Sequence, residues 1–404
     1  MMAKDWVCLR YLPPSAYGKV MPEQKGSNNI RFLQALAKPG ANALADWLKN
    51  NDLDGEAVIW LNLHGLAPYA FHRLFETNLI EQVAEEPRTA LDLAYCIGLG
   101  RALARERELE RILIALAAED IEPILFKGAV LAYTAYPTPA CRPMWDLDLW
   151  LTAEEMPRGR AALEGLGYRR HSKETRPPVF QKRHFGEIQM LGAQPGNIPV
   201  ELHWSAFAGV WLDQAAAVDH AAVRARAVLV TVAGQQALAL ASEDAIIQLA
   251  VHLAVNHQMA APGLRGLLDV ALMARTQPVD WAVVAERAQA WRIGTAVWIV
   301  LRLAEELVGL TEATPAVARL KPGFMRRQLL ACLVNADSML AKRDISRGPL
   351  RFALLLLLVD RYRDIAAIVA RAVWPERGWL AARYGRAGFR MRLRHLAGAV
   401  RGRF

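Results

Sequence analysis

Asp146 and Asp148 lie two positions apart in a stretch that opens with alternating polar and apolar residues, the pattern of a β-strand. On such a strand both carboxylates project from the same face. Neighbouring carboxylates repel each other and are costly to desolvate unless a cation lies between them. A divalent metal ion is the simplest such cation, and Mg²⁺ is commonly held by one or two carboxylates together with substrate phosphates. The pair therefore predicts a metal site.

A turn that suits phosphate lies upstream, with Gly128 18 positions before Asp146. The short apolar run Ile121–Phe126 predicts a strand that ends at Lys127-Gly128, and a helix-forming segment, Ala129–Tyr136, follows. Backbone N–H groups and the positive end of a helix dipole at this turn could bind phosphate. Each feature alone is common, but their order and spacing predict a site for a metal-bound nucleotide.

These motifs resemble the nucleotidyltransferase superfamily, which has the polymerase β fold, and within it the uncharacterised nucleotidyltransferase family. The matching segments lie between about residue 30 and about residue 290, and the clearest are 125–128, 136–137, 142–144, 146–148, 200–204 and 240–252. The resemblance implies an α+β fold, with a mixed sheet core and large helical N- and C-terminal regions. Many superfamily members have Gly-Ser at the turn. Here the pair is Gly128-Ala129, which leaves backbone N–H groups and Lys127 to hold phosphate.

In the superfamily a third carboxylate comes from a later strand, and Glu201 fits this place. Within the segment 200–204, alternation puts Glu201 and His203 on one face of the expected strand. The resemblance therefore implies that Asp146, Asp148 and Glu201 are the catalytic metal ligands, holding two Mg²⁺ ions or Mn²⁺ in their place.

Nucleotide binding is expected from the turn and from two further side chains. The residues assigned to it are Lys127, Gly128, Ala129, Arg142 and His203. Alternatives remain open for two of them. Arg142 could neutralise phosphate charge or anchor its own loop, and His203 could hydrogen-bond a carboxylate or a phosphate or pack under Trp204.

The implied reaction transfers a nucleoside monophosphate from an NTP to a hydroxyl acceptor, with pyrophosphate leaving. The acceptor could be a small molecule, a peptide or protein, or an RNA end. One alternative is a non-catalytic nucleotide-binding or regulatory module on the same fold. The presence of all three carboxylates argues against this alternative. Another is a metal-dependent glycosyltransferase, which would have a doubly wound nucleotide half before Asp-x-Asp. This chain has helical patterns there.

Composition shifts and periodicity predict five regions. They are a poorly ordered leader (1–28), an N-terminal helical region (29–118), the nucleotidyltransferase core (119–205), a C-terminal helical region (206–369) and a basic tail (370–404). Only helices are expected after Ser205. Among them, His252 and His257 are five positions apart, which would place them on different helix faces and argues against shared zinc ligation. Arg265 and Asp269 are spaced to pair with each other, though Arg265 could reach a phosphate.

The net charge of +9 is concentrated in the tail, where residues 370–404 hold nine arginines and one glutamate. Aromatic and aliphatic residues are interleaved with the arginines, so the tail could lie on an anionic membrane surface, bind RNA or an acidic partner, or form a solvated helix packed by its Leu and Phe residues. The four cysteines are far apart and form no CxxC pair, and the N-terminus lacks the apolar segment of a signal peptide. A cytoplasmic protein is expected, with peripheral membrane association open through the tail.

Overall fold

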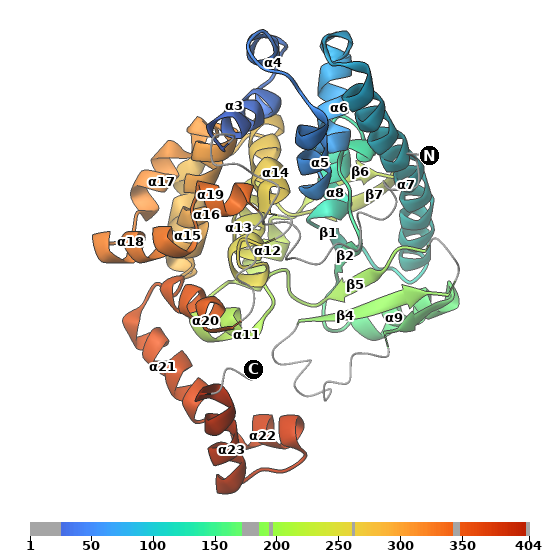
Figure 1. Ribbon diagram of the computed structural model, residues 1–404. Coiled ribbons are helices and arrows are strands. Elements are labelled where there is room, and N and C mark those ends of the chain that lie inside the picture. Colours follow the sequence, from blue (N-terminus) through green and yellow to red (C-terminus); the bar gives the residue numbers. More distant parts are fainter. Residues whose placement is uncertain (1–25, 172–185, 194–196, 261–262, 342–347, 401–404) are drawn as a thin grey trace.

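The computed structural model describes residues 26–171, 186–193, 197–260, 263–341 and 348–400 (Figure 1). A seven-stranded mixed sheet is flanked by helices, and 64% of the structure is helical. This confirms the predicted α+β class, with a nucleotidyltransferase-like sheet and large helical regions on either side of it in the sequence. The predicted leader falls almost wholly outside the described residues.

The strands are short and come from both halves of the chain. In chain order they are β1 (Ile124–Leu125), β2 (Leu147–Trp150), β3 (Tyr168–Arg170), β4 (Glu187–Gly192), β5 (Val200–His203), β6 (Val228–Val232) and β7 (Gln235–Ala239). Their order across the sheet is β3-β4-β5-β2-β1-β7-β6. The pairs β2–β5 and β1–β7 are parallel, and the other four neighbouring pairs are antiparallel. The sheet is therefore mixed, as predicted, and most of its strand pairs are antiparallel.

The register between β2 and β5 decides which side chains meet. Asp148 lies opposite Glu201, and Trp150 lies opposite His203. Because side chains alternate along a strand, the intervening leucines and Val200 point to the other face, where they are buried in the core. The two central strands thus bring one acidic residue each to the same face at the same level.

The hairpin β6–β7 corrects the expectation that only helices follow Ser205. Its two-residue turn, Ala233-Gly234, has positive φ at both positions, 49° and 72°, which matches the twist of a hairpin. Strand β7 then pairs in parallel with β1, so residues far beyond the expected core complete the sheet. The valine-rich alternation of 228–232 is the local signal for a strand that the helical interpretation overlooked.

One group of helices precedes the first strand or lies between strands in the sequence. The longest of them, α7, runs beside α6 and contacts α9. Their bounds are α3 (Gly26–Ala37), α4 (Asn42–Leu48), α5 (Gly55–Leu63), α6 (Ala67–Glu76), α7 (Glu85–Ala117), α8 (Gly128–Thr134), α9 (Met156–Gly165), α11 (Val210–Ala215) and α12 (His220–Ala225). A capping box precedes α9. Thr152 N–H donates to Glu155 Oε2 at 2.7 Å, and Glu155 N–H donates to Thr152 Oγ1 at 3.2 Å.

The C-terminal helices gather around α16, which packs against α14, α13 and α3, except that α22 and α23 lie apart from the rest (Figure 1). They are α13 (Ser242–Val251), α14 (Gly263–Thr276), α15 (Trp281–Ala290), α16 (Gly294–Val308), α17 (Thr314–Leu320), α18 (Phe324–Leu333), α19 (Ala336–Leu340), α20 (Gly348–Leu357), α21 (Tyr362–Val373), α22 (Arg377–Tyr384) and α23 (Phe389–Val400). In the described residues no helix combines the length and the apolar character that a membrane crossing needs.

Candidate metal and nucleotide site

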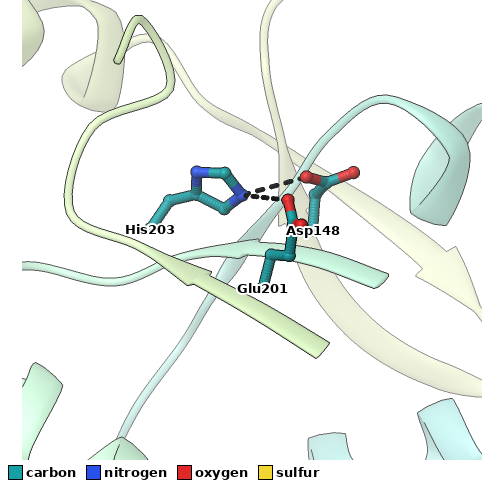
Figure 2. Close-up of side chains that lie close together, drawn as sticks. All are labelled: Asp148, Glu201 and His203. Atoms are coloured by element: carbon teal, nitrogen blue, oxygen red, sulfur yellow. Dashed lines mark hydrogen bonds and ion pairs between the residues drawn. The ribbon is translucent and has the colours of Figure 1, made fainter. Parts of the chain in front are cut away.

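Asp148, Glu201 and His203 converge on one face of the sheet (Figure 2). One ligand atom from each lies within 4.8 Å of the others. His203 Nε2 is 2.9 Å from Asp148 Oδ1 and 3.6 Å from Glu201 Oε2. Asp148 and His203 are each only 2% exposed, and Glu201 is half-buried. Of the options left open for His203, the structure shows a hydrogen bond to a carboxylate.

Lys127 reaches the same carboxylate from the turn between β1 and α8. Its Nζ donates to Asp148 Oδ1 at 2.7 Å. The residue has φ 54°, a conformation that non-glycine residues rarely adopt and that is often found at functional sites. Burial lowers the pKa of Lys127, but the charges of Asp148 and Glu201 outweigh it and raise the pKa, so the ammonium is retained.

His203 has a carboxylate on each side of its ring. Glu187, its register partner on β4, places Oε2 3.4 Å from His203 Nδ1, while Nε2 points to Asp148. Burial lowers the pKa of His203, but hydrogen bonds to Asp148 and Glu201 outweigh it and raise the pKa to about 9. The ring is therefore an imidazolium at neutral pH. Sequence reasoning missed Glu187, which has no local motif and is brought in by strand pairing.

Asp146 lies just before β2 and is not part of the cluster of three. Burial, together with the charges of Asp148 and Glu201, raises the pKa of Asp146 to about 7. The predicted carboxylate set is thus arranged as a close pair, Asp148 and Glu201, with His203 beside it and Asp146 within electrostatic reach. A metal-binding role for Asp146 stays a prediction.

The donor set of Asp148, Glu201 and His203 fits a divalent metal ion. It offers two carboxylates and one imidazole in a largely buried setting, and after burial the charges of Asp148 and Glu201 raise the pKa of the neighbouring Asp146. Oxygen ligands suit Mg²⁺ and Mn²⁺, whereas imidazole is more usual with Mn²⁺ and later transition metals than with Mg²⁺. Ligation through His203 Nε2 requires the neutral ring, so binding there would release its proton.

Arg142 adopts the second of its two expected roles, anchoring its loop. Its Nε and Nη2 donate to the two oxygens of Asp269 on α14 at 2.9 and 2.8 Å, and Tyr136 Oη donates to the same carboxylate at 2.8 Å. The expected pair between Arg265 and Asp269 is therefore wrong, because Asp269 is already bonded to residues distant in the sequence. The fork-to-fork geometry ties the loop before β2 to the C-terminal helices.

Gly128 and Ala129 lie at the start of α8 and are both buried. A Cβ atom at Gly128 would lie 2.4 Å from Arg142 Nη1, so the glycine is needed for close packing. The unusual φ of the turn falls on Lys127 instead. The predicted roles of Gly128 and Ala129 in phosphate binding are not tested by these contacts.

His252 and His257 are in contact, contrary to the expectation that they lie on different helix faces. A π-helical turn, η5 (His252–Asn256), follows α13, and His257 N–H donates to His252 O at 3.0 Å. The i+5 hydrogen bond aligns residues that would be about 140° apart in an α-helix. Their Nε2 atoms are 2.9 Å apart, so one ring donates to the other. Burial, followed by the charge of Lys127, lowers the pKa of both rings.

The sheet order, the parallel β2–β5 pair and the acidic residues on it define a nucleotidyltransferase-like α+β protein. The chain belongs to the uncharacterised nucleotidyltransferase family, whose model matches residues 53–309. No curated protein and no solved structure shows significant similarity to it.

Proposed function

We propose that the protein is a metal-dependent nucleotidyltransferase that moves a nucleoside monophosphate from an NTP to a hydroxyl acceptor. The observation that carries the proposal is the pairing of Asp148 with Glu201 on adjacent parallel strands, with His203 Nε2 between their carboxylates. Membership of the family supports the reaction class. The acceptor class remains open among small molecules, peptides or proteins, and RNA ends.

Asp148, Glu201 and His203 would hold the metal ion, with Asp146 as a further ligand. Mg²⁺, with two ions bound, is the proposed cofactor, and Mn²⁺ is its alternative. When bound, such an ion lowers the pKa of an attacking hydroxyl and offsets charge on the reacting phosphate. Glu187 holds the His203 ring by its Nδ1 side, which fixes the direction in which Nε2 points. Lys127 supplies positive charge beside the turn where the phosphates would lie.

A second candidate function is nucleotide binding without turnover. The observation that favours it is that Asp148 Oδ1 already accepts hydrogen bonds from Lys127 and His203, so its charge is balanced by the protein alone. A module of this kind would bind the NTP through the same turn and leave its phosphates intact.

The deciding experiment incubates the full-length chain with Mg²⁺ or Mn²⁺ and each labelled NTP, with and without host lysate as a source of acceptor. Release of pyrophosphate that depends on metal, and that is lost in Asp148→Asn and Glu201→Gln, supports the transferase. Metal-dependent NTP binding without any pyrophosphate release supports the binding module. If neither binding nor release depends on Asp148 or Glu201, both proposals fail.

The basic tail suggests a second partner. Trp374, Phe389 and Leu393 are between 47% and 62% exposed on α21–α23, among exposed arginines. An anionic membrane surface or RNA fits this combination of charge and apolar area. A cytoplasmic location is proposed because Cys96, Cys141 and Cys332 are free thiols, which suits a reducing compartment.

A further inference from the structure

Three buried arginines are grouped around the loop that leads to β2 and the candidate metal site. Arg142 is in this loop, Arg105 bonds to the loop carbonyl of Met144, and Arg265 is one helical turn before Asp269, the partner of Arg142. Arg105 on α7, Arg142 before β2 and Arg265 on α14 are 7%, 6% and 9% exposed. Among the described residues, the carboxylate of Asp269 is the one that bonds to any of them, and it bonds to Arg142. Three buried guanidinium groups are thus matched by a single bonded acid.

Arg105 and Arg265 have unused hydrogen-bond donors. Arg105 Nη1 donates to Met144 O at 2.9 Å, but its Nε and Nη2 have no partner within the described chain. Arg265 Nε is also buried without a partner, and the structure shows no hydrogen bond or ion pair for its guanidinium among the described residues. Buried charges in proteins are normally paired, because an isolated one loses its hydration without compensation.

The three charges act on one another and on the metal site. Burial, and then the charge of Arg142, lowers the pKa of Arg265, and burial lowers that of Arg105 to about 10. The charge of Asp146, which lies just before β2, partly opposes the lowering of the pKa of Arg265. The pKa of His257 falls to about 4 through burial, Lys127 and Arg265 in turn. The charges of Lys127 and Arg265 thus both disfavour the protonated form of His257.

The Arg265 side chain is also held in place. Its Nη1 lies 3.1 Å from the position that a Cβ would take at Gly65, a loop residue with φ 68°. Gly266, the next residue on α14, packs against Leu253 in the π-helical turn. The guanidinium thus lies against the loop at Gly65, and no carboxylate among the described residues bonds to it.

We propose that Arg265 contacts a phosphate group bound beside the metal site, and that Arg105, which no acid among the described residues pairs with, supplies further positive charge. An anion supplies the charge and the acceptor oxygens that the described residues do not provide. Two sources share this chemistry, the β- and γ-phosphates of the nucleotide and a phosphate on the acceptor. The assignment of either source rests on the proposed function, whereas the anion site itself does not.

The test measures binding of inorganic pyrophosphate to the full-length chain by calorimetry in EDTA. We expect Arg265→Met to weaken binding about tenfold or more, and Arg265→Lys, which keeps the charge, to retain most of the affinity. The melting temperature of Arg265→Met without ligand should equal or exceed that of the unmodified chain, because an unpaired buried charge is removed. Arg105→Met should show a smaller loss of affinity.

Arg275→Met is the matched control on the same helix. Arg275 donates to the carbonyls of Ala37 and Gly309, so its loss should lower the melting temperature and leave pyrophosphate binding unchanged. The proposal is overturned if the unmodified chain does not bind pyrophosphate in EDTA. The proposal is also overturned if the pyrophosphate affinity of Arg265→Met is within twofold of that of the unmodified chain. It is overturned as well if Arg265→Met has a lower melting temperature than the unmodified chain, as expected for Arg275→Met.

Competition identifies the source of the phosphate. If pyrophosphate displaces Mg²⁺-ATP and AMP does not displace pyrophosphate, the site takes the β- and γ-phosphates. If pyrophosphate and Mg²⁺-ATP bind at the same time, the site takes a phosphate of the acceptor. Either result supports a phosphate site at Arg265. Pyrophosphate binding in EDTA needs neither metal nor turnover, so its result does not depend on the transferase proposal. If the protein is not a transferase, the chain can still bind pyrophosphate, and Asp148→Asn can bind it too. If the protein is a transferase but Arg265 does not contact phosphate, Arg265→Met will bind pyrophosphate as the unmodified chain does.

Discussion

Lys127 and Asp148 form a buried ion pair, with Nζ 2.7 Å from Oδ1, at the carboxylate that the candidate metal ion would need. Burial raises the pKa of Asp148, but Lys127 and His203 outweigh it, so the pKa is lowered and the carboxylate is ionised before any metal binds. The same ammonium competes with the ion for Oδ1. Lys127 thus prepares the site and limits its affinity for metal alone.

Replacing Lys127 with Met should therefore change metal and nucleotide binding in opposite directions. Free Mn²⁺ should bind several-fold more tightly, because it no longer displaces an ammonium from Asp148, whereas NTP should bind more weakly without the nearby positive charge. Electron paramagnetic resonance titration of Mn²⁺, with and without NTP, measures both effects. Equal Mn²⁺ affinity in Lys127→Met and the unmodified chain would show that the Lys127 ammonium does not compete with the metal ion for Asp148.

The two aspartates of the motif should differ in their effect on stability. Asp148→Asn leaves Lys127 and His203 without their carboxylate and should lower the free energy of unfolding by about 3 kcal/mol. Asp146→Asn should raise it at pH 8. The pKa of Asp146 is raised from 3.8 to about 7 in the folded protein, so the folded state binds more protons than the unfolded one between these values. Stability from this group therefore falls as the pH rises from 4 to 7.

Chemical denaturation in EDTA at pH 5 and pH 8 measures this contrast without metal. The gain in Asp146→Asn should shrink toward pH 5, where the native carboxyl is already protonated. A loss of stability in Asp146→Asn as large as that in Asp148→Asn would mean that Asp146 has a bonded partner, contrary to the repulsion inferred here.

The relative positions of residues that are close in sequence or on one strand were predictable. Contacts between residues that are distant in sequence and meet only in the folded chain were not. Alternation placed Glu201 and His203 on one face, and the resemblance placed Glu201 near Asp148, which the register confirms. Glu187 was not predictable, because nothing local shows that β4 will lie beside β5. The bond from Arg142 to Asp269 joins residues 127 positions apart.

Local geometry explains the other differences. The α-helical angle of 100° per residue separates His252 from His257, but one π-helical turn aligns them, and no sequence rule applied to this segment predicts such a turn. The glycine at 128 suggested backbone freedom, whereas the positive φ falls on Lys127 and the glycine makes room for Arg142.

Gly128→Ala tests that packing. A Cβ there would lie 2.4 Å from Arg142 Nη1 and should disturb the bidentate bond to Asp269, so we expect a loss of about 2 kcal/mol or more in the free energy of unfolding. Gly100→Ala is the control, because that glycine is in α7 with nothing within 4 Å of its Cβ position. It should gain about 0.5–1 kcal/mol from helix propensity. If urea denaturation gave the same change in the free energy of unfolding for Gly128→Ala and Gly100→Ala, the packing role of Gly128 would be contradicted.

The histidine pair should make the protein less stable in mild acid. The pKa of His257 falls from 6.5 to about 4 through burial, Lys127 and Arg265, while Asp148 and Glu201 act in the opposite sense. The unfolded state therefore binds more protons between pH 6.5 and 4, and stability is lost as the pH falls through this range, by about 2 kcal/mol at pH 5. His252→Gln/His257→Gln should show a flatter change between pH 8 and pH 5 in thermal unfolding. An unchanged slope would assign the acid sensitivity to other groups.

The tail allows a test that separates its two proposed partners. Helix α23 folds back on α21, with the guanidinium of Arg392 4.4 Å from the ring centre of Trp374 and His395 Nε2 2.9 Å from Ala372 O. Phe389 and Leu393 remain 62% and 50% exposed on α23. A membrane surface would use both the arginines and these apolar side chains, whereas RNA phosphates would use mainly the arginines.

Phe389→Ser/Leu393→Ser should therefore weaken flotation with anionic vesicles and leave RNA filter binding unchanged. Arg386→Gln/Arg390→Gln/Arg394→Gln should weaken whichever partner binds, most strongly at low salt, because charges are screened over about 8–10 Å at moderate ionic strength. Residues 127–203 are unaltered in both variants, so nucleotide binding provides the control for an intact core. If the unmodified chain binds neither vesicles nor RNA at low salt, the arginines form a solvated surface and the partner proposal is wrong.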